Sequence, residues 1–204
     1  MSGRYLGGRP QRHALRGYVV AAPDHRAHRP AQHGQPGRAA AARCDRRLGH
    51  IAGPQHVSTG ALRRAGFKAA AARAGLSTQN TLIETARAYT RDEGRLAALR
   101  LLDRERPPTA IVAANDLLAL GIYDALGERG LKCASDVSVV GHNDMPYVDM
   151  LSPPLTTVRI AQREMGNQAA RLLLDAIADP AARRERVVLE PKLIVRGSTA
   201  KPRE

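Results

Sequence analysis

Residues 111–126 read IVAANDLLALGIYDAL, and this stretch decides the fold. A short β-branched apolar run stops at Asn115 and Asp116, and an apolar pattern with helical spacing begins at once. A buried strand that leads directly into a helix is the basic unit of a sheet covered by helices. The amide and the carboxylate at the junction allow two interpretations, a helix N-cap or polar groups directed into a binding site.

The same alternation of strand and helix extends outwards from this stretch. The predicted strands are 48–52, 81–86, 110–114, 137–140, 187–189 and 193–195, and the predicted helices are 61–74, 93–104, 116–129 and 160–178. The strands are apolar without strict alternation, which is typical of strands buried on both faces of a parallel sheet. The predicted fold class is therefore α/β, a doubly wound parallel sheet, in which ligands bind beyond the carboxyl ends of the strands.

The composition of the chain indicates its size class and its cellular location. The chain has 204 residues and is 43% hydrophobic, enough for one or two domains with a core. No apolar run approaches the ~20 residues that span a bilayer, and no secretory signal is evident at the N-terminus. Two cysteines, Cys44 and Cys133, make no disulfide framework. We expect a cytoplasmic protein.

The N-terminal segment differs from the rest of the chain. Residues 1–47 hold ten arginines and two acidic residues, so they carry +8 of the net charge of +13. Arg, Ala, Gly, His and Pro dominate, and such a segment offers too little apolar surface to offset its ordering entropy. We expect residues 1–45 to be disordered, or to be read from a shifted frame of a GC-rich gene, which resequencing would test. Residues 46–204 form the second unit.

A basic arm that binds nucleic acid is a further interpretation of this segment. It lacks the interleaved aromatic residues that stack on bases and any helix-turn-helix pattern. Salt-dependent DNA binding that disappears when the arm is removed would support this interpretation.

Polar side chains gather where predicted strands end. Arg63 follows the first strand, and its guanidinium suits an anionic or hydroxylated ligand, whereas Arg64 is expected to be a solvated charge. Asn143 and Asp144 follow the strand at 137–140, where they would serve a ligand or merely form a turn. Tyr89 would stack on a ligand ring or pack in the core.

Catalytic patterns are absent from the sequence. It contains no GxSxG, HExxH, P-loop or GxGxxG motif, and His50, His56 and His142 lack the spacing of metal ligands. We therefore expect a binding protein rather than an enzyme, with no cofactor and no metal.

Taken in order, the motifs resemble those of a known family. The runs HIAGP, STGALRRAGFKAA, PPTAIVAANDLLALGIYDALGERGL, DVSVVGHNDMPYVDMLSPPLTTVRI, MGNQAARLLLDAI and PKLIVRGST closely resemble the effector-binding region of LacI/GalR transcription regulators, from residue 46 to about 200. The resemblance implies a two-lobed sensor of the type I periplasmic-binding-protein kind, preceded by a helix-turn-helix and a hinge helix. The match begins where the family's second lobe begins, so we expect an N-terminally truncated chain with one lobe.

The resemblance also implies which residues bind the effector, a sugar or nucleoside-like molecule. They are Thr59, Arg63, Tyr89, Asn115, Asn143 and Asp144. Asn143 stands where many members have an aspartate, which shifts the hydrogen-bond balance towards donors. At the 115–116 junction we expect one residue to cap the helix and Asn115 to reach the ligand.

The family also suggests partners. Members dimerise through this lobe, and Leu117, Leu120 and Leu151 fall at matching apolar positions, so a homodimer is expected. The helix at 160–178 carries an apolar face that normally packs on the first lobe. Operator DNA is expected as a partner only where a helix-turn-helix is present. The alternative function is a sugar-binding component of a transporter, which a signal peptide encoded upstream would support.

Overall fold

The structure is a computed structural model that describes residues 47–181 and 186–201. The segment 1–45, for which disorder or a frame change is expected, lies outside the described residues. The strands are β1 (Leu48–Ala52), β2 (Thr81–Thr85), β3 (Ala110–Ala113), β4 (Ser138–Asn143), β5 (Thr156–Arg159) and β6 (Lys192–Ile194). The helices are α1 (Ser58–Arg73), the short 3-10 turn η2 (Thr78–Asn80), α2 (Arg91–Leu102), α3 (Asp116–Glu128) and α4 (Gln162–Ala178).

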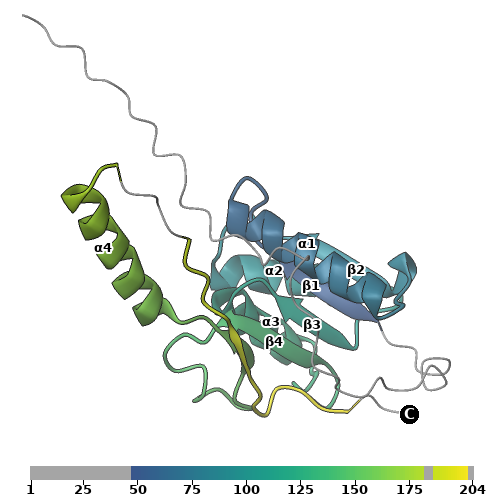
Figure 1. The fold of residues 1–204 in the computed structure, drawn as a ribbon. Coiled ribbons are helices and arrows are strands. Elements are labelled where there is room, and N and C mark those ends of the chain that lie inside the picture. The colour runs from purple at the N-terminus through teal and green to yellow at the C-terminus, as the bar shows by residue number, and fades with distance from the viewer. Residues whose placement is uncertain (1–46, 182–185, 202–204) are drawn as a thin grey trace, which may run out of the picture.

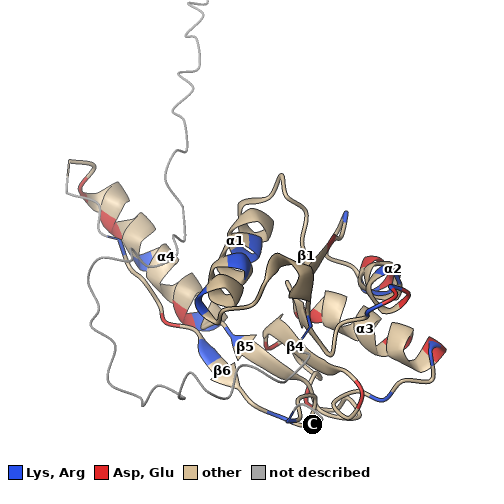
Figure 2. Ribbon diagram, turned by 90° about the vertical axis from the view of Figure 1, so that its right-hand side faces the viewer, with Lys and Arg blue, Asp and Glu red and all other residues tan. Residues whose placement is uncertain are grey.

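The strands form one sheet in the order β2-β1-β3-β4-β5-β6. All neighbouring pairs are parallel except β5 and β6, which are antiparallel. Helix α1 lies on one side of the sheet, and α2 and α3 lie on the other (Figures 1 and 2). The predicted α/β doubly wound class is confirmed, with an antiparallel strand added at one edge.

The strand order reverses between β1 and β3. From β1 the chain runs outwards to β2 and then returns across β1 to β3, so α1 and α2 leave on opposite faces. Their connections part here, at the carboxyl ends of β1 and β3, which is the position at which open α/β sheets bind ligands. The polar residues at 53–63 and 114–116 lie at this point.

Two strands differ from the prediction. Strand β4 was predicted to stop before Gly141, but it continues to Asn143 because residues 140–143 pair with β5. Strand β5 itself was not predicted, since it is short and follows a proline pair. The predicted strand at 187–189 does not form, whereas β6 falls within one residue of its predicted place.

Helices α2 and α3 pack closely because glycines face each other. A Cβ on Gly94 would lie 2.4 Å from the Leu118 carbonyl oxygen, and one on Gly121 would lie 2.1 Å from that of Arg91. Ion pairs join the outer surfaces of the two helices, among them Arg91 with Asp124 at 2.6 Å. The start of α3 is thereby held rigidly against the sheet.

The C-terminal segment fastens β4 to β5. The fully buried Ser198 accepts a hydrogen bond from Thr156 N at 2.7 Å and donates one to the Val139 carbonyl at 2.6 Å. The backbone of Ser198 also accepts from Val139 N at 2.8 Å. Ser198 therefore ties the segment after α4 to the sheet, although most of residues 192–200 lie at the surface.

Helix α4 stands apart from the sheet (Figure 1). None of its residues is buried, and Leu173, Leu174 and Ile177 are 53%, 66% and 67% exposed. Its apolar face has no partner in the described part of the chain. No helix in the described ranges is long and apolar enough to cross a membrane.

Candidate functional site

Arg63 is the centre of the polar cluster. It lies in the second turn of α1, and its guanidinium reaches across the end of the sheet. Nη1 donates to the Ala114 carbonyl at 2.6 Å, and Nη2 donates to Asn143 Oδ1 at 3.3 Å. Partial burial lowers the pKa of Arg63, an effect that the nearby Tyr89 and Asp116 oppose. One side chain thus joins α1 to the ends of β3 and β4.

Asn143 closes β4 with an unusual backbone. Its φ of 121° lies in a region that L-residues rarely adopt, where Asn is among the few tolerated side chains. His142 Nδ1 lies 3.0 Å from the Asn143 Oδ1 that Arg63 also contacts. Burial lowers the pKa of His142, and the charge of Arg63 lowers it further. Backbone strain of this kind is typical of functional sites.

Asn115 and Asp116, at the junction between β3 and α3, make different contacts from those expected. Asn115 is itself the N-cap, because its Oδ1 accepts from Leu118 N at 2.9 Å. The expectation that the other residue would cap is therefore wrong. Asp116 is fully buried and accepts from Thr157 Oγ1 at 2.7 Å and Met145 N at 2.8 Å. Asn115 therefore caps α3, whereas Asp116 joins the start of α3 to β5 and to the backbone after β4.

Tyr89 lies against the end of β1 and the first turn of α1. A Cβ on Gly53 would fall 2.3 Å from the Tyr89 ring, so only glycine lets the ring lie against the backbone there. The phenol oxygen lies 3.3 Å from Thr59 Oγ1. The ring also packs against the buried core, as one of the two predictions for Tyr89 expected, and its stacking on a ligand ring stays a prediction.

Asp144 is committed to two arginines. Its carboxylate pairs with Arg159 at 2.6 Å and Arg196 at 2.8 Å, and its side chain is only 7% exposed. Burial alone would raise the pKa of Asp144, but hydrogen bonds from Arg196 and Arg159 hold it below its usual range. Neither arginine was predicted from the sequence as a partner of Asp144. Asp144 fixes the edge of the site and has little free oxygen for a ligand.

Arg64 is not the solvated charge expected from the sequence. It is half-buried, donates to Gln55 Oε1 at 3.2 Å, and has no hydrogen-bond partner at Nε among the described residues. His50 nearby is buried, stacks on Phe67 at 4.6 Å between ring centroids, and has a pKa lowered to about 4 by burial. These residues support α1 beneath the site.

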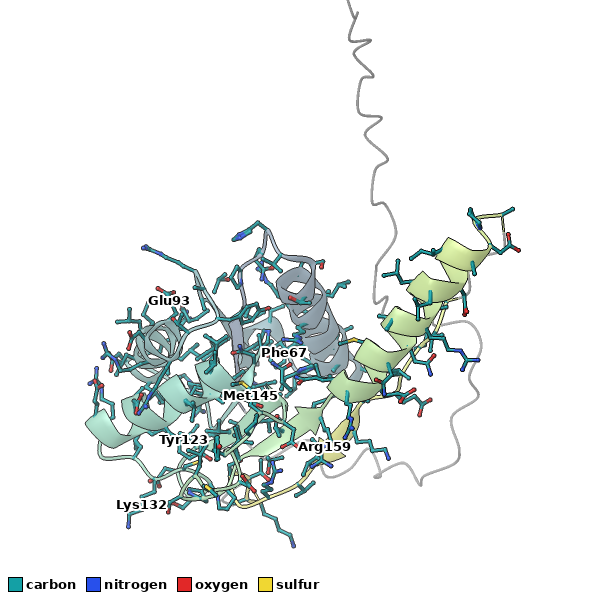
Figure 3. The ribbon with its side chains drawn as sticks, turned by 90° about the vertical axis from the view of Figure 1, so that its left-hand side faces the viewer. Phe67, Glu93, Tyr123, Lys132, Met145 and Arg159 are labelled. Atoms are coloured by element: carbon teal, nitrogen blue, oxygen red, sulfur yellow. The ribbon has the colours of Figure 1, made fainter. Side chains whose placement is uncertain are left out.

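The cluster borders an open hollow of about 660 Å³. Asn143, Asp144 and Arg159 line one side, and the first turns of α4 line the other. Figure 3 shows Arg159 where β5 ends, close to the start of α4. Within residues 47–181 and 186–201, no group of three or more His, Cys, Asp or Glu could hold a metal ion.

Five of the six predicted effector residues thus meet at one edge. Arg63 contacts Asn143 and the residue before Asn115, and Tyr89 contacts Thr59. Gly53, His142 and Asp116 also shape the edge. In the sequence these residues look like ordinary turn and helix-cap residues. Their place in the site becomes visible only in the folded structure.

Comparison with known proteins places this architecture in a class. Residues 39–199 match the family model described as a periplasmic binding protein-like domain. The HTH-type transcriptional regulator CelR of Thermobifida fusca is 37% identical over 153 residues, which are 75% of this chain and 45% of CelR. The chain belongs to the periplasmic binding protein-like family, and the relatives and solved structures that it matches include LacI-family transcription regulators.

Solved structures agree with this placement. A CelR–cellobiose complex superposes with a TM-score of 0.70 at 37% identity, covering 75% of this chain and 46% of that one. A lac repressor dimer bound to operator and the anti-inducer ONPF gives 0.70 at 28% identity, covering 76% and 53%. The chain spans about half the length of these relatives, which are transcription regulators rather than enzymes.

Proposed function

We propose that this lobe binds a sugar-like or nucleoside-like effector at the edge formed by Thr59, Arg63, Tyr89, Asn115 and Asn143. In this proposal the chain is the sensing part of a transcription regulator, and operator binding depends on a helix-turn-helix. The observation that carries the proposal is the reach of Arg63 to both the Ala114 carbonyl and Asn143. It assembles one polar edge from three separate elements at the switch point of the sheet.

The relatives support a small polyhydroxylated ligand. The solved CelR structure is a complex with cellobiose, and a LacI-family regulator of Enterococcus faecium has bound ribose. A ring of Tyr, Asn and Arg groups can satisfy hydroxyls and at the same time cover an apolar sugar face.

Affinity for the lobe alone is expected to be weak. Each hydrogen bond from this open edge replaces one to water and contributes about 0.5–1.5 kcal/mol at best. Three or four such bonds, set against the entropy lost on association, leave millimolar affinity.

Titration of the chain with sugars and nucleosides, followed by NMR, tests the site. Ligand-induced shifts should include Asn115 and Asn143 and should disappear in Arg63→Ala. The matched control is Arg73→Ala, which removes a charge from the last turn of the same helix. Shifts that survive Arg63→Ala would place the ligand elsewhere and contradict the proposal.

We further propose that two lobes associate through α3. Leu117 and Leu120 are half-buried on this helix and Leu151 packs at the border of the core. The loop after β4 runs beside α3, since Met145 N bonds to Asp116 and Tyr123 to the Pro153 carbonyl. This loop adds the exposed Tyr147 and Met150, at 73% and 77%.

Sedimentation of Leu120→Asp tests this interface. The variant should be monomeric at concentrations where the parent chain dimerises. Leu62→Asp, which alters an exposed leucine on α1 across the sheet, should leave the dimer intact. A dimer unaffected by Leu120→Asp would disprove the α3 interface.

A further inference from the structure

The side-chain oxygens of Asn115 and Asn143 already accept hydrogen bonds within the protein. Asn115 Oδ1 accepts from Leu118 N, and Asn143 Oδ1 accepts from Arg63 Nη2. A backbone N–H and a guanidinium can only donate, so each contact fixes which end of its amide is the oxygen. Asn143 Oδ1 also lies 3.0 Å from His142 Nδ1. Both amide oxygens are thus engaged, whereas no hydrogen bond in the described ranges involves the Nδ2 donor of either asparagine.

The neighbouring carboxylates are equally committed. Asp116 is 0% exposed and its two oxygens accept from Thr157 Oγ1 and Met145 N. Asp144 has one oxygen on Arg159 and the other on Arg196. Neither carboxylate is placed to accept hydrogen bonds from the hydroxyls of a neutral sugar, the task that acidic groups ordinarily perform in such sites.

Arg63 makes no ion pair within the described ranges. Its contacts there are the Ala114 carbonyl, the Asn143 amide and the neighbouring phenol of Tyr89, and the buried Asp116, whose charge acts on it, has both oxygens bonded to other groups. Two of its five N–H groups are used by the carbonyl and the amide. A half-buried cation is stabilised when a paired, hydrogen-bonded anion reaches it.

We propose that this edge selects a ligand that carries an anionic oxygen group, carboxylate or phosphate, on a polyhydroxylated body, in preference to the neutral sugar. The inference rests on the proposed function, because it concerns the same site. Arg63 would face the oxyanion as a two-pronged donor, flanked by the Nδ2 groups of Asn115 and Asn143. Thr59 and Tyr89 have hydroxyls that either donate or accept, so they suit the polyol part.

Matched ligand pairs test the proposal on the full chain. NMR titrations to tens of millimolar would compare gluconate with glucose, and glucose 6-phosphate with glucose. Acetate and inorganic phosphate show how much of any effect belongs to the oxyanion alone. We expect at least one anionic sugar to bind about tenfold more tightly than glucose, which corresponds to ~1.4 kcal/mol. The ligand pair that shows the difference in affinity identifies the anionic group as the carboxylate of a sugar acid or the phosphate of a sugar phosphate.

Three variants make the result specific. Arg63→Gln should abolish the preference for the anion, whereas Arg73→Gln, which removes the same charge at the end of α1, should retain it. Asn143→Asp supplies Arg63 with a counter-ion and the ligand with an acceptor, so it should reverse the preference towards glucose. Circular dichroism of each variant would confirm that it is folded.

The outcomes separate this inference from the proposed function. Arg63-dependent binding of glucose that equals or exceeds binding of both anions would overturn the anion preference and leave the proposed site standing. An anion preference lost equally in Arg73→Gln would reduce it to general attraction by a basic chain and also overturn it. No Arg63-dependent shift with any ligand would contradict both.

Discussion

Asp116 is a buried carboxylate whose hydrogen bonds link separate elements of the fold. It joins the start of α3 to the hydroxyl of Thr157 in β5 and to the backbone after β4, and Gly141 leaves the space that its Oδ1 occupies. The hydrogen bond that caps α3 is the one that the neighbouring Asn115 side chain makes among the described residues. Adjacent residues of similar size therefore make very different contributions to stability.

Urea denaturation of alanine variants should reveal this difference. Asn115→Ala should lower the free energy of unfolding by about 1 kcal/mol, the usual loss for an N-cap. Asp116→Ala leaves two buried donors without a partner and should lower it by roughly 2–5 kcal/mol. Equal losses for the two variants would show that Asp116 does not fasten the strands.

The ion pairs of Asp144 make stability depend on acid pH. Its folded pKa lies below the ordinary value, because the hydrogen bonds from Arg196 and Arg159 outweigh the opposing effect of burial. The resulting stabilisation is fully present above the unfolded pKa and is lost as the pH falls through the folded one.

Denaturation curves recorded from neutral pH down to about pH 2 test this dependence. The parent chain should be more stable than Asp144→Asn near neutrality, and the difference should shrink as the pH falls below about 4. A difference that stays constant across this range would show that the carboxylate charge is not the cause.

At the scale of elements, the glycine contact sets how closely α2 and α3 approach. Gly121→Ala would place a Cβ 2.1 Å from the Arg91 carbonyl oxygen and 2.3 Å from Arg95 N, so the helices must separate. We expect a loss of roughly 1–3 kcal/mol in the free energy of unfolding.

Gly127→Ala is the control on the same helix. Nothing lies within 4 Å of a Cβ there, so the better helix propensity of alanine should stabilise the chain by up to about 1 kcal/mol. Thermal unfolding followed by circular dichroism would show the two opposite signs. A stabilising Gly121→Ala would mean that the helices are not in backbone contact.

The sequence predicted those elements whose signals are local. Strand β3 and helix α3 were placed within one residue at each end, because a β-branched run and a helical apolar pattern meet at one junction. Strand β5 carries no such signal, since its four residues owe their conformation to the neighbouring β4 and β6. A strand that is stabilised by pairing with adjacent strands, and not by the propensities of its own residues, is not predicted from the local sequence.

The site divides in the same way. The carboxyl ends of parallel strands share one rim, so the positions of Arg63, Asn115 and Asn143 at or just beyond predicted strand ends were enough to predict that they lie together. Which residue would cap α3, and the pairing of Asp144 with Arg196, did not follow. Both depend on atomic distances between segments up to 52 positions apart in sequence.

At the scale of the whole molecule, α4 is the element with least tertiary support. It has no buried residue, and an isolated helix of 17 residues is marginal in water. Hydrogen exchange should therefore show little protection in α4 and strong protection in α3, whose residues include seven that are buried.

The dependence of this exchange on concentration adds a second readout. Protection of α4 that rises with protein concentration would mean that its leucine face packs between copies. Protection equal to that of α3 in dilute solution would contradict the unpacked position of α4. Leu174→Ser, which alters an exposed residue of that face, should weaken only the concentration-dependent protection.

The antiparallel pairing of β5 and β6 has a consequence for engineering. Arg159 pairs with Lys192, Val158 with Leu193 and Thr157 with Ile194, which is the register of a β-hairpin. The chain therefore leaves the sheet and re-enters it at adjacent positions, and residues 160–191 are an insertion at the tip of that hairpin. A short Asn-Gly turn has the geometry to replace them. The result would be a minimal scaffold that keeps Arg63, Asn115 and Asn143, onto which a different closing segment can be grafted.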